Sequence, residues 1–175
     1  MDEPLVSVVM ITYNHEKFIE EAIIGVLIQK CNFNVELIIA NDCSSDKTDE
    51  IVQNYFKKNT NSSWIKYFRQ TNNVGVMPNF IFAMDKCNGK YIALCEGDDY
   101  WTDPYKLQKQ VDFLEKNLNY SICFHEAKVI TETGNSYLYN KIQNEKTFTI
   151  KDLARVNFIS TASCVFRHNK YKLPD

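Results

Sequence analysis

The sequence has few glycines and lacks any long apolar segment. Its 5 glycines among 175 residues form no G-x-G-x-x-G loop after the first predicted strand, which argues against a dinucleotide-dependent dehydrogenase. No apolar run approaches the roughly 20 residues of a membrane span, and the start Met1–Pro4 lacks the basic region of a signal peptide. We therefore expect no transmembrane segment and a cytoplasmic protein, either free or peripheral at the inner membrane face.

An excess of basic residues is also absent. Lys and Arg number 20 and Asp and Glu number 22, which gives a formal net charge of -2. This balance provides no electrostatic attraction to nucleic acid, so no nucleic-acid partner is predicted. The 6 cysteines show no C-x-x-C spacing, which opposes a zinc site and favours reduced thiols packed as small hydrophobic side chains.

Short apolar runs alternate along the chain with segments of helical periodicity. The run from Leu5 to Ile11 is continuous and rich in β-branched residues, as is typical of a strand buried on both faces of a parallel sheet. Further strands are predicted at 35–40, 65–68 and 91–94, and helices at about 18–27, 48–58, 78–88 and 107–114. The remaining residues predict a hairpin from 122–130 with a turn at 133–135, a short helix near Leu153 and a strand at 163–166.

This alternation predicts one α/β domain over residues 1–175, with a Rossmann-like, mainly parallel sheet flanked by helices and a C-terminal hairpin or mixed extension. Sheets of this kind bind ligands at the carboxyl ends of their strands. Polar clusters follow three of the predicted strands there, at 12–14, 41–46 and 96–99. We therefore expect these clusters to form one site.

The cluster after the strand at 91–94 places Glu96, Asp98 and Asp99 within four positions. Neighbouring negative charges raise one another's pKa, and a divalent cation that bridges carboxylate and phosphate oxygens relieves this repulsion. Gly97 lets the backbone turn closely at this point. The alternative is a solvated acidic turn before the next helix, and this motif alone does not decide between them.

The other two clusters offer weaker signals. Asp46 is placed to cap the helix at 48–58, whereas Asp42 lies too early for capping and is predicted to accept hydrogen bonds from a ligand. Thr12, Tyr13 and Asn14 offer a hydroxyl, an aromatic face and an amide, and a base is able to stack on Tyr13. The three histidines are far apart and show no ligand spacing, so no chemistry is assigned to them.

Several segments, taken in order, resemble the family 2 glycosyltransferases with the GT-A fold. The resemblance extends from about Val6 to Glu115 and continues more weakly from Phe158 to Arg167, in the segments VSVVMITYNHEKFIEEAI, ELIIANDCSSDKT, NNVGV, GKYIALCEGDDYWTDPYKLQKQVDFLE and FISTASCVFR. It implies an enzyme that uses a nucleotide-diphosphate sugar with Mg²⁺ or Mn²⁺ and transfers the sugar to an acceptor hydroxyl with inversion. UDP is the favoured carrier, and the implied acceptor is a saccharide or a lipid-linked molecule of a bacterial surface-polysaccharide pathway.

The resemblance also assigns residues. It implies a nucleotide-sugar-binding part at about 1–117 and the start of an acceptor-side part at about 118–175. Asp99 would bind the metal directly, and Asp98 would contact the ribose or assist at the metal. The residues that match the family's nucleotide-sugar contacts are Thr12, Tyr13, Asn14, Asp42, Asn73, Gly75 and Asp98.

The chain departs from the family pattern at two positions, because Asn41 and Glu96 stand where many relatives carry aspartate. The family's general base is expected shortly beyond Asp175, so residues 1–175 are predicted to bind nucleotide with metal but to turn over poorly. A non-catalytic nucleotide-sugar-binding module remains an alternative. A phosphoacceptor receiver domain fits less well, since it needs an acidic pair directly after the first strand, where Thr12, Tyr13 and Asn14 stand.

Overall fold

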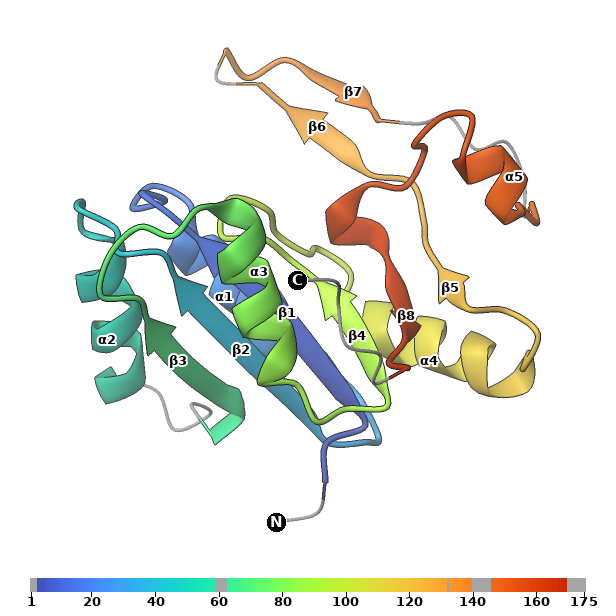
Figure 1. Cartoon of the computed structure of the whole chain (residues 1–175), viewed down its shortest axis with the longest axis horizontal. Helices are drawn as coiled ribbons and strands as arrows, with labels where there is room; N and C mark the ends of the chain where they lie inside the picture. Colours follow the sequence, from blue (N-terminus) through green and yellow to red (C-terminus); the bar gives the residue numbers. More distant parts are fainter. Residues whose placement is uncertain (1–2, 59–62, 132, 140–145, 170–175) are drawn as a thin grey trace.

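The computed structural model describes residues 3–58, 63–131, 133–139 and 146–169. A sheet with the strand order β3-β2-β1-β4-β8-β5 forms its centre (Figure 1). Strands β1 to β4 are mutually parallel, whereas β8 runs antiparallel to both β4 and β5. The strands comprise β1 Val6–Thr12, β2 Val35–Asn41, β3 Ile65–Arg69, β4 Tyr91–Leu94, β5 Ile122–Cys123 and β8 Val165–Arg167.

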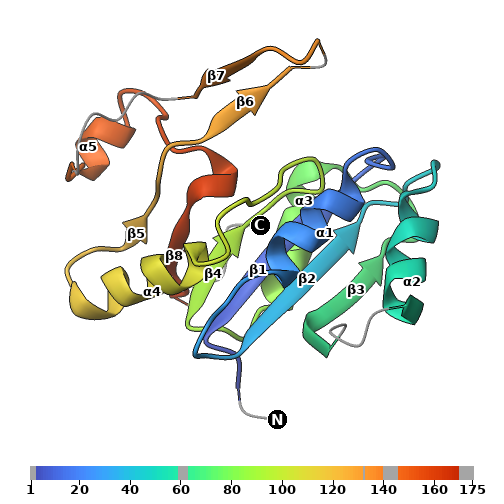
Figure 2. The same cartoon turned by 180° about the vertical axis from the view of Figure 1, so that it is seen from behind.

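Helices cover both faces of this sheet, with α1 and α3 on opposite sides (Figures 1 and 2). The predicted alternation of strands and helices is thereby confirmed, with boundaries within about two residues for most elements. The helices comprise α1 Ile19–Leu27, α2 Thr48–Lys58, α3 Val76–Asp85, α4 Lys106–Lys116 and α5 Ile150–Leu153.

The continuous apolar run of β1 is explained by two separate cores. Val6, Val8 and Met10 point to the face covered by α1, α2 and α4, and all three are fully buried. Val9 and Ile11 point to the other face, where they pack with Ala83 of α3. Because successive side chains of a strand alternate between faces, a strand that is covered on both sides needs apolar residues at nearly every position.

The prediction that residues 122–130 form one arm of a hairpin is wrong for its first two residues. Ile122 and Cys123 form edge strand β5 of the main sheet and pair with Phe166 and Val165 of β8. The chain then leaves the sheet at Phe124, whose ring lies 5.7 Å from that of Phe158. The hairpin itself consists of β6 (Lys128–Ile130) and β7 (Ser136–Leu138).

The C-terminal extension lies beyond the main sheet. The hairpin β6–β7 and helix α5 stand apart from the parallel strands in both views, and the chain returns to the sheet through β8 (Figures 1 and 2). Among the described residues, no helix combines the length and apolar character that crossing a bilayer requires.

Candidate functional site

The loops after β1, β2 and β4 meet at the carboxyl edge of the sheet, as the sequence predicted. Thr12 and Asn41 end their strands in register, and the N–H of Asp42 donates to the carbonyl of Thr12 at 2.9 Å. On the other side of β1, the N–H of Gly97 donates to the carbonyl of Ile11 at 2.9 Å. The parallel ladder thus continues into the loops and holds the three polar clusters together.

The loop after β1 is tied to the loop after β2 through Asn14. Asn14 adopts a left-handed backbone conformation with φ 56°, which a short amide side chain tolerates better than most residues do. Its side-chain oxygen accepts the N–H of Ser45 at 2.9 Å, and its own N–H donates to the Ser44 hydroxyl at 3.0 Å. Tyr13, in contrast, keeps 44% of its surface exposed, so its ring is available at the edge of the site.

Asp42 holds the loop that precedes α3. The residue is 4% exposed, and its carboxylate accepts the N–H groups of Val74 at 2.8 Å and Gly75 at 2.9 Å. Gly75 also donates to the side chain of Asn73 at 3.0 Å, and its φ of 90° lies in the region that favours glycine. The structure therefore brings Asp42, Asn73 and Gly75 together, although they are separated by about thirty residues in the sequence.

Asn41, the first of the two departures from the family pattern, is fully buried and uses both ends of its amide. The oxygen accepts from the backbone N–H and the hydroxyl of Ser44, at 2.9 and 2.7 Å. The Nδ2 group donates to the Tyr67 hydroxyl at 2.8 Å, and that hydroxyl donates in turn to Asp49. A carboxylate has no donor for Tyr67, so this network explains why the chain accommodates asparagine here.

Helix α2 begins with the cap that its sequence predicted. The Oδ1 atom of Asp46 accepts the N–H of Thr48 at 2.9 Å, while its Oδ2 atom accepts the N–H of Glu16 at 2.9 Å. The carboxylate of Glu16 in turn accepts the N–H of Lys47 at 3.0 Å. Asp46 therefore caps the helix and also joins it to the loop after β1.

The acidic loop after β4 folds into a tight turn. The N–H of Asp99 donates to the carbonyl of Glu96 at 3.0 Å, and the side chain of Asp98 remains about half exposed. Burial, together with the charge of Asp98, raises the pKa of Asp99 to about 6. Burial and the charges of Asp99 and Asp98 raise the pKa of Glu96 as well. The three carboxylates thus concentrate negative charge, and among the described residues no Lys or Arg side chain forms an ion pair with them.

These carboxylates fit a divalent cation that takes part of its ligands from a bound molecule. Hard cations such as Mg²⁺ and Mn²⁺ favour oxygen ligands, and ionised carboxylates whose pKa is raised by repulsion gain from a nearby positive charge. In the described part of the chain, no three His, Cys, Asp or Glu side chains converge as a complete metal site. Additional oxygen donors, such as those of a diphosphate, would have to complete the coordination.

Sequence reasoning missed His15, which lies beside the acidic loop. Its Nε2 atom is 3.8 Å from Oδ2 of Asp98, although 83 positions separate the two residues. Its Nδ1 atom and the Oγ1 atom of Thr12 are buried and make no hydrogen bond within the described residues. Spacing gave no signal for this contact, because only the pairing of β1 with β4 brings the two loops together.

Trp101 connects the acidic loop to the C-terminal extension. It is 4% exposed, and its indole N–H donates to the carbonyl of Ala162 at 2.8 Å. The Lys106 ammonium lies 4.1 Å from the centre of the Trp101 ring and donates to Gln110 at 2.8 Å. Burial lowers the pKa of Lys106 to about 8. Trp101 therefore belongs to the core, together with Leu107, Val111 and Leu114 of the helix that follows it.

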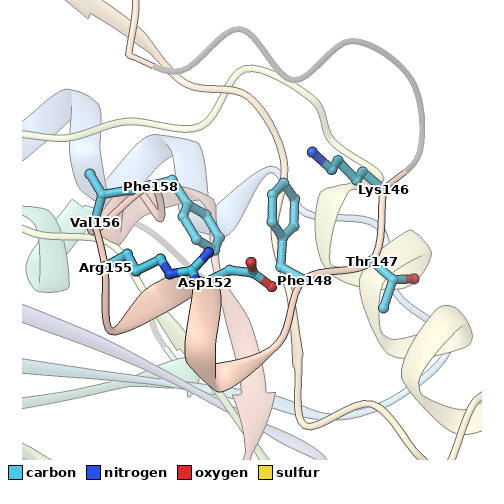
Figure 3. A pocket seen from close by; sticks show the side chains of 7 residues that line it. All are labelled: Lys146, Thr147, Phe148, Asp152, Arg155, Val156 and Phe158. Carbon is cyan, nitrogen blue, oxygen red and sulfur yellow. The ribbon is translucent and has the colours of Figure 1, made fainter.

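A hollow lies in the C-terminal extension and is lined by residues between 146 and 158 (Figure 3). It measures about 350 Å³, and Phe148 and Phe158 form its apolar wall, with ring centres 4.4 Å apart. Arg155 and Lys146 lie at its border, whereas Asp152 accepts hydrogen bonds from the backbone and hydroxyl of Thr149. The hollow contains none of the site residues predicted from the sequence.

A parallel sheet of order 3-2-1-4, continued by antiparallel strands and followed by an acidic loop at its carboxyl edge, is the arrangement of glycosyltransferases with the GT-A fold. The family model for Glycosyl transferase family 2 matches residues 7–172. The chain belongs to this family.

Relatives in bacteria agree with this assignment. An uncharacterized protein of Mycobacterium tuberculosis is 41% identical over 162 residues, which are 92% of this chain and 46% of the relative. The putative teichuronic acid biosynthesis glycosyltransferase TuaG of Bacillus subtilis is 35% identical over 112 residues, or 64% of this chain and 42% of the relative. The chain thus spans about half the length of these relatives.

Solved structures show the same fold. S. aureus TarS in complex with UDP-GlcNAc has a TM-score of 0.55 and is 26% identical, with 65% of this chain and 32% of that chain covered. The mannosyltransferase PcManGT from Pyrobaculum calidifontis, in complex with GDP-Man and Mn²⁺, has a TM-score of 0.67 at 16% identity, with 95% of this chain and 45% of that chain covered. The predicted GT-A fold is confirmed.

Proposed function

We propose that this chain binds a nucleotide-diphosphate sugar together with Mn²⁺ or Mg²⁺ and forms the donor side of an inverting glycosyltransferase. The observation that carries the proposal is the position of Glu96, Asp98 and Asp99, whose loop lies at the carboxyl edge of the sheet beside Thr12. The pKa of Asp99 is raised to about 6 there by burial and by Asp98. The carboxylates of this loop and a diphosphate are both negatively charged. A site that holds a diphosphate beside this loop therefore needs a cation between the carboxylates and the diphosphate.

The residues around this loop supply the remaining contacts of the proposed site. We assign the direct metal bond to Asp99, and to Asp98 the ribose contact or a supporting role at the metal. The exposed ring of Tyr13 is a stacking surface for the base, because the flat face of a base stacks well on an aromatic ring. Thr12 and Asn14 shape the adjoining turn, and the Asn14 side chain does so by fixing Ser45.

Asp42, Asn73 and Gly75 form the proposed base side of the site. Each Asp42 oxygen already accepts one backbone N–H, from Val74 or Gly75. A carboxylate oxygen has a second lone pair, so Asp42 is able to accept an N–H from the base while it holds the loop. This dual use explains why a nearly buried carboxylate occurs at the end of β2.

In the proposed reaction, Asp99, supported by Asp98, would hold a divalent cation, and this cation would supply positive charge opposite the departing diphosphate. Glu96, Asp98 and Asp99 orient the diphosphate end of the donor, and the loops after β1 and β2 orient its nucleoside end. Holding the donor in one geometry is itself a large part of catalysis. Transfer with inversion also needs a base that deprotonates the acceptor hydroxyl, and we propose that a segment outside residues 1–175 provides it.

The donor and the pathway are proposed from the relatives. TarS is solved with UDP-GlcNAc, and TuaG is named for teichuronic acid biosynthesis. We therefore propose a UDP-sugar as donor and a saccharide or lipid-linked acceptor in the synthesis of a bacterial surface polysaccharide. In this proposal, residues 1–117 bind the donor and residues 118–175 begin the acceptor side.

Calorimetric titration tests the donor site. UDP, GDP and dTDP are titrated into the chain with Mn²⁺ and with a chelator, and the same series is repeated with Asp99→Ala. We expect UDP to bind most tightly, to need Mn²⁺, and to lose about tenfold or more in affinity in the variant. Equal UDP affinity with and without Mn²⁺, or full metal-dependent binding by Asp99→Ala, would contradict the proposal.

A further inference from the structure

His15 lies where the loop after β1 meets the acidic loop, and its backbone is fixed on both sides. Its N–H donates to the Thr48 hydroxyl at 2.9 Å, and its carbonyl accepts the N–H groups of Phe18 and Ile19 at 2.9 Å each. These bonds anchor the residue at the start of helices α1 and α2. The position of the imidazole is therefore set by the scaffold and not by the acidic loop that it faces.

The ring packs closely against the acidic loop. A Cβ atom added at Gly97 would lie 2.8 Å from Nδ1 of His15 and 2.6 Å from Oγ1 of Thr12, which is closer than such contacts permit. On its other side, the ring presents Nε2 to Asp98 Oδ2 at 3.8 Å. Gly97 thus leaves room for both Thr12 and His15 beside the acidic loop.

Two polar atoms beside Gly97 have no hydrogen-bond partner among the described residues. Thr12 is 3% exposed, and its Oγ1 atom is buried without a hydrogen bond, as is Nδ1 of His15. Buried polar groups without partners are rare in folded proteins. A hydroxyl both donates and accepts, whereas a neutral imidazole has one donor nitrogen and one acceptor nitrogen. The two unpaired atoms are therefore complementary.

We propose that His15 is a positioning residue of the donor site: when metal and nucleotide are bound, the two atoms that are unpaired in this structure form a hydrogen bond in which Thr12 Oγ1 donates to His15 Nδ1. This bond places the ring proton on Nε2, and Nε2–H donates to Asp98. This inference rests on the proposed function. The hydrogen bond from Thr12 fixes the tautomer, as partners of the other ring nitrogen commonly do. The imidazole then aligns a half-exposed carboxylate.

Substitutions at position 15 distinguish the role of Nε2 from that of Nδ1. The amide N–H of glutamine reaches approximately to the place of Nε2, whereas that of asparagine reaches only to the place of Nδ1. UDP affinity in the presence of Mn²⁺ is expected to fall about tenfold in His15→Ala and His15→Asn, but only about twofold in His15→Gln. Affinity for UDP in a chelator should change little in all three, because the contact to Asp98 serves the metal end of the site.

A double-mutant cycle tests the link to Thr12. Thr12→Val removes the hydroxyl at nearly constant shape, and we expect its loss of Mn²⁺-dependent affinity to be much smaller in a His15→Ala background than in the wild type. His168→Gln is the matched control, since this histidine contacts the carbonyl of Gly89, which precedes β4, and not the acidic loop. It should leave nucleotide affinity unchanged.

The outcomes distinguish this inference from the proposed function. If the wild type shows no Mn²⁺-dependent UDP binding, the donor site itself is wrong. If the wild type binds but His15→Ala binds equally well, or if glutamine and asparagine weaken binding to the same extent, the positioning role is overturned. Thermal unfolding is recorded for each variant, and if His15→Ala fails to fold, the comparison of His15→Gln with His15→Asn decides the question.

Discussion

Gly97 lies so close to Thr12 that a Cβ atom at position 97 would come within 2.6 Å of the Thr12 hydroxyl oxygen and 2.7 Å of its Cβ. Thr12 is buried at the end of β1 and has little room to move. The contact joins the acidic loop to the central strand of the sheet, so the position of the carboxylates depends on the absence of a side chain at this one residue.

Gly97→Ala is therefore expected to displace the acidic loop. Forcing a methyl group into a filled space commonly costs about 1 to 3 kcal/mol in stability, and we expect Mn²⁺-dependent nucleotide affinity to fall by about tenfold or more. Urea unfolding and calorimetry measure the two effects. Gly134→Ala is the control: it is strained by a φ of 80° but has open space around it, so it should lower stability without changing nucleotide affinity.

Asp42→Asn should loosen the loop before α3. One oxygen of the carboxylate is replaced by an NH₂ group, so either Val74 loses the acceptor of its N–H or Gly75 keeps only that of Asn73. We expect a loss of stability of about 1 to 2 kcal/mol, faster amide hydrogen exchange at these two residues and weaker nucleotide binding. Unchanged exchange at Val74 and Gly75 together with unchanged UDP affinity would contradict the proposed role of Asp42.

Glu36 lies near the start of β2, at the end of the sheet opposite to the acidic loop. A substitution there tests stability independently of nucleotide binding. Burial alone would raise its pKa, but hydrogen bonds from Lys66, Ser7 and the backbone of Asn88 together lower it. A lowered pKa in the folded state means that the stabilisation is present above the ordinary carboxyl range and is lost as the pH falls through the folded pKa.

Glu36→Ala is thus expected to lose about 2 to 4 kcal/mol in the free energy of unfolding at pH 7, because Ser7 and Asn88 lose their buried partner. The difference between wild type and variant should shrink as the pH falls below the ordinary glutamate range. Urea titrations at several pH values measure this dependence. Nucleotide affinity of the folded variant should remain that of the wild type; a specific loss of UDP binding at full stability would be inconsistent with the assignment of the site to the other end.

Local sequence signals predicted the elements and the acidic loop, but not the contacts between loops. The apolar run of β1 and the cap at Asp46 depend on neighbouring residues, so their patterns are visible in the sequence. The bond from Ser45 to Asn14 and the approach of His15 to Asp98 join residues 31 and 83 positions apart. They arise from strand order, which composition and periodicity do not determine.

The same reasoning explains the error at Ile122 and Cys123. A short apolar stretch followed by a turn signal fits a hairpin arm as well as an edge strand. What decides between them is β8, which arrives from more than forty residues later and pairs with both residues. The roles of Asp42, Asp98 and Asp99 stay predictions, since they concern a bound molecule.

Asp99 links pH, stability and cation binding. Its pKa is raised to about 6 by burial and by Asp98, so the folded, metal-free protein holds a proton more tightly than the unfolded chain does. For a raised carboxyl pKa, the stabilisation is fully present below the ordinary aspartate range and is lost as the pH rises through about 6. A cation competes with that proton, so Mn²⁺-dependent UDP affinity should fall as the pH is lowered through about 6.

Asp99→Asn separates these effects, because it removes the charge at nearly constant size. At pH 7.5 without metal, the variant should be more stable than the wild type by roughly 1 kcal/mol after allowance for solvent screening, and its thermal midpoint should not respond to Mn²⁺ and UDP. The wild type should instead be stabilised by them, since ligands that bind the folded state raise its stability.

Asp112→Asn, on the exposed side of α4, serves as the control for removing one negative charge. If Asp99→Asn were less stable than the wild type and still responded to Mn²⁺ and UDP, the acidic loop would not be the cation site, and its carboxylates would have to be explained as part of the scaffold.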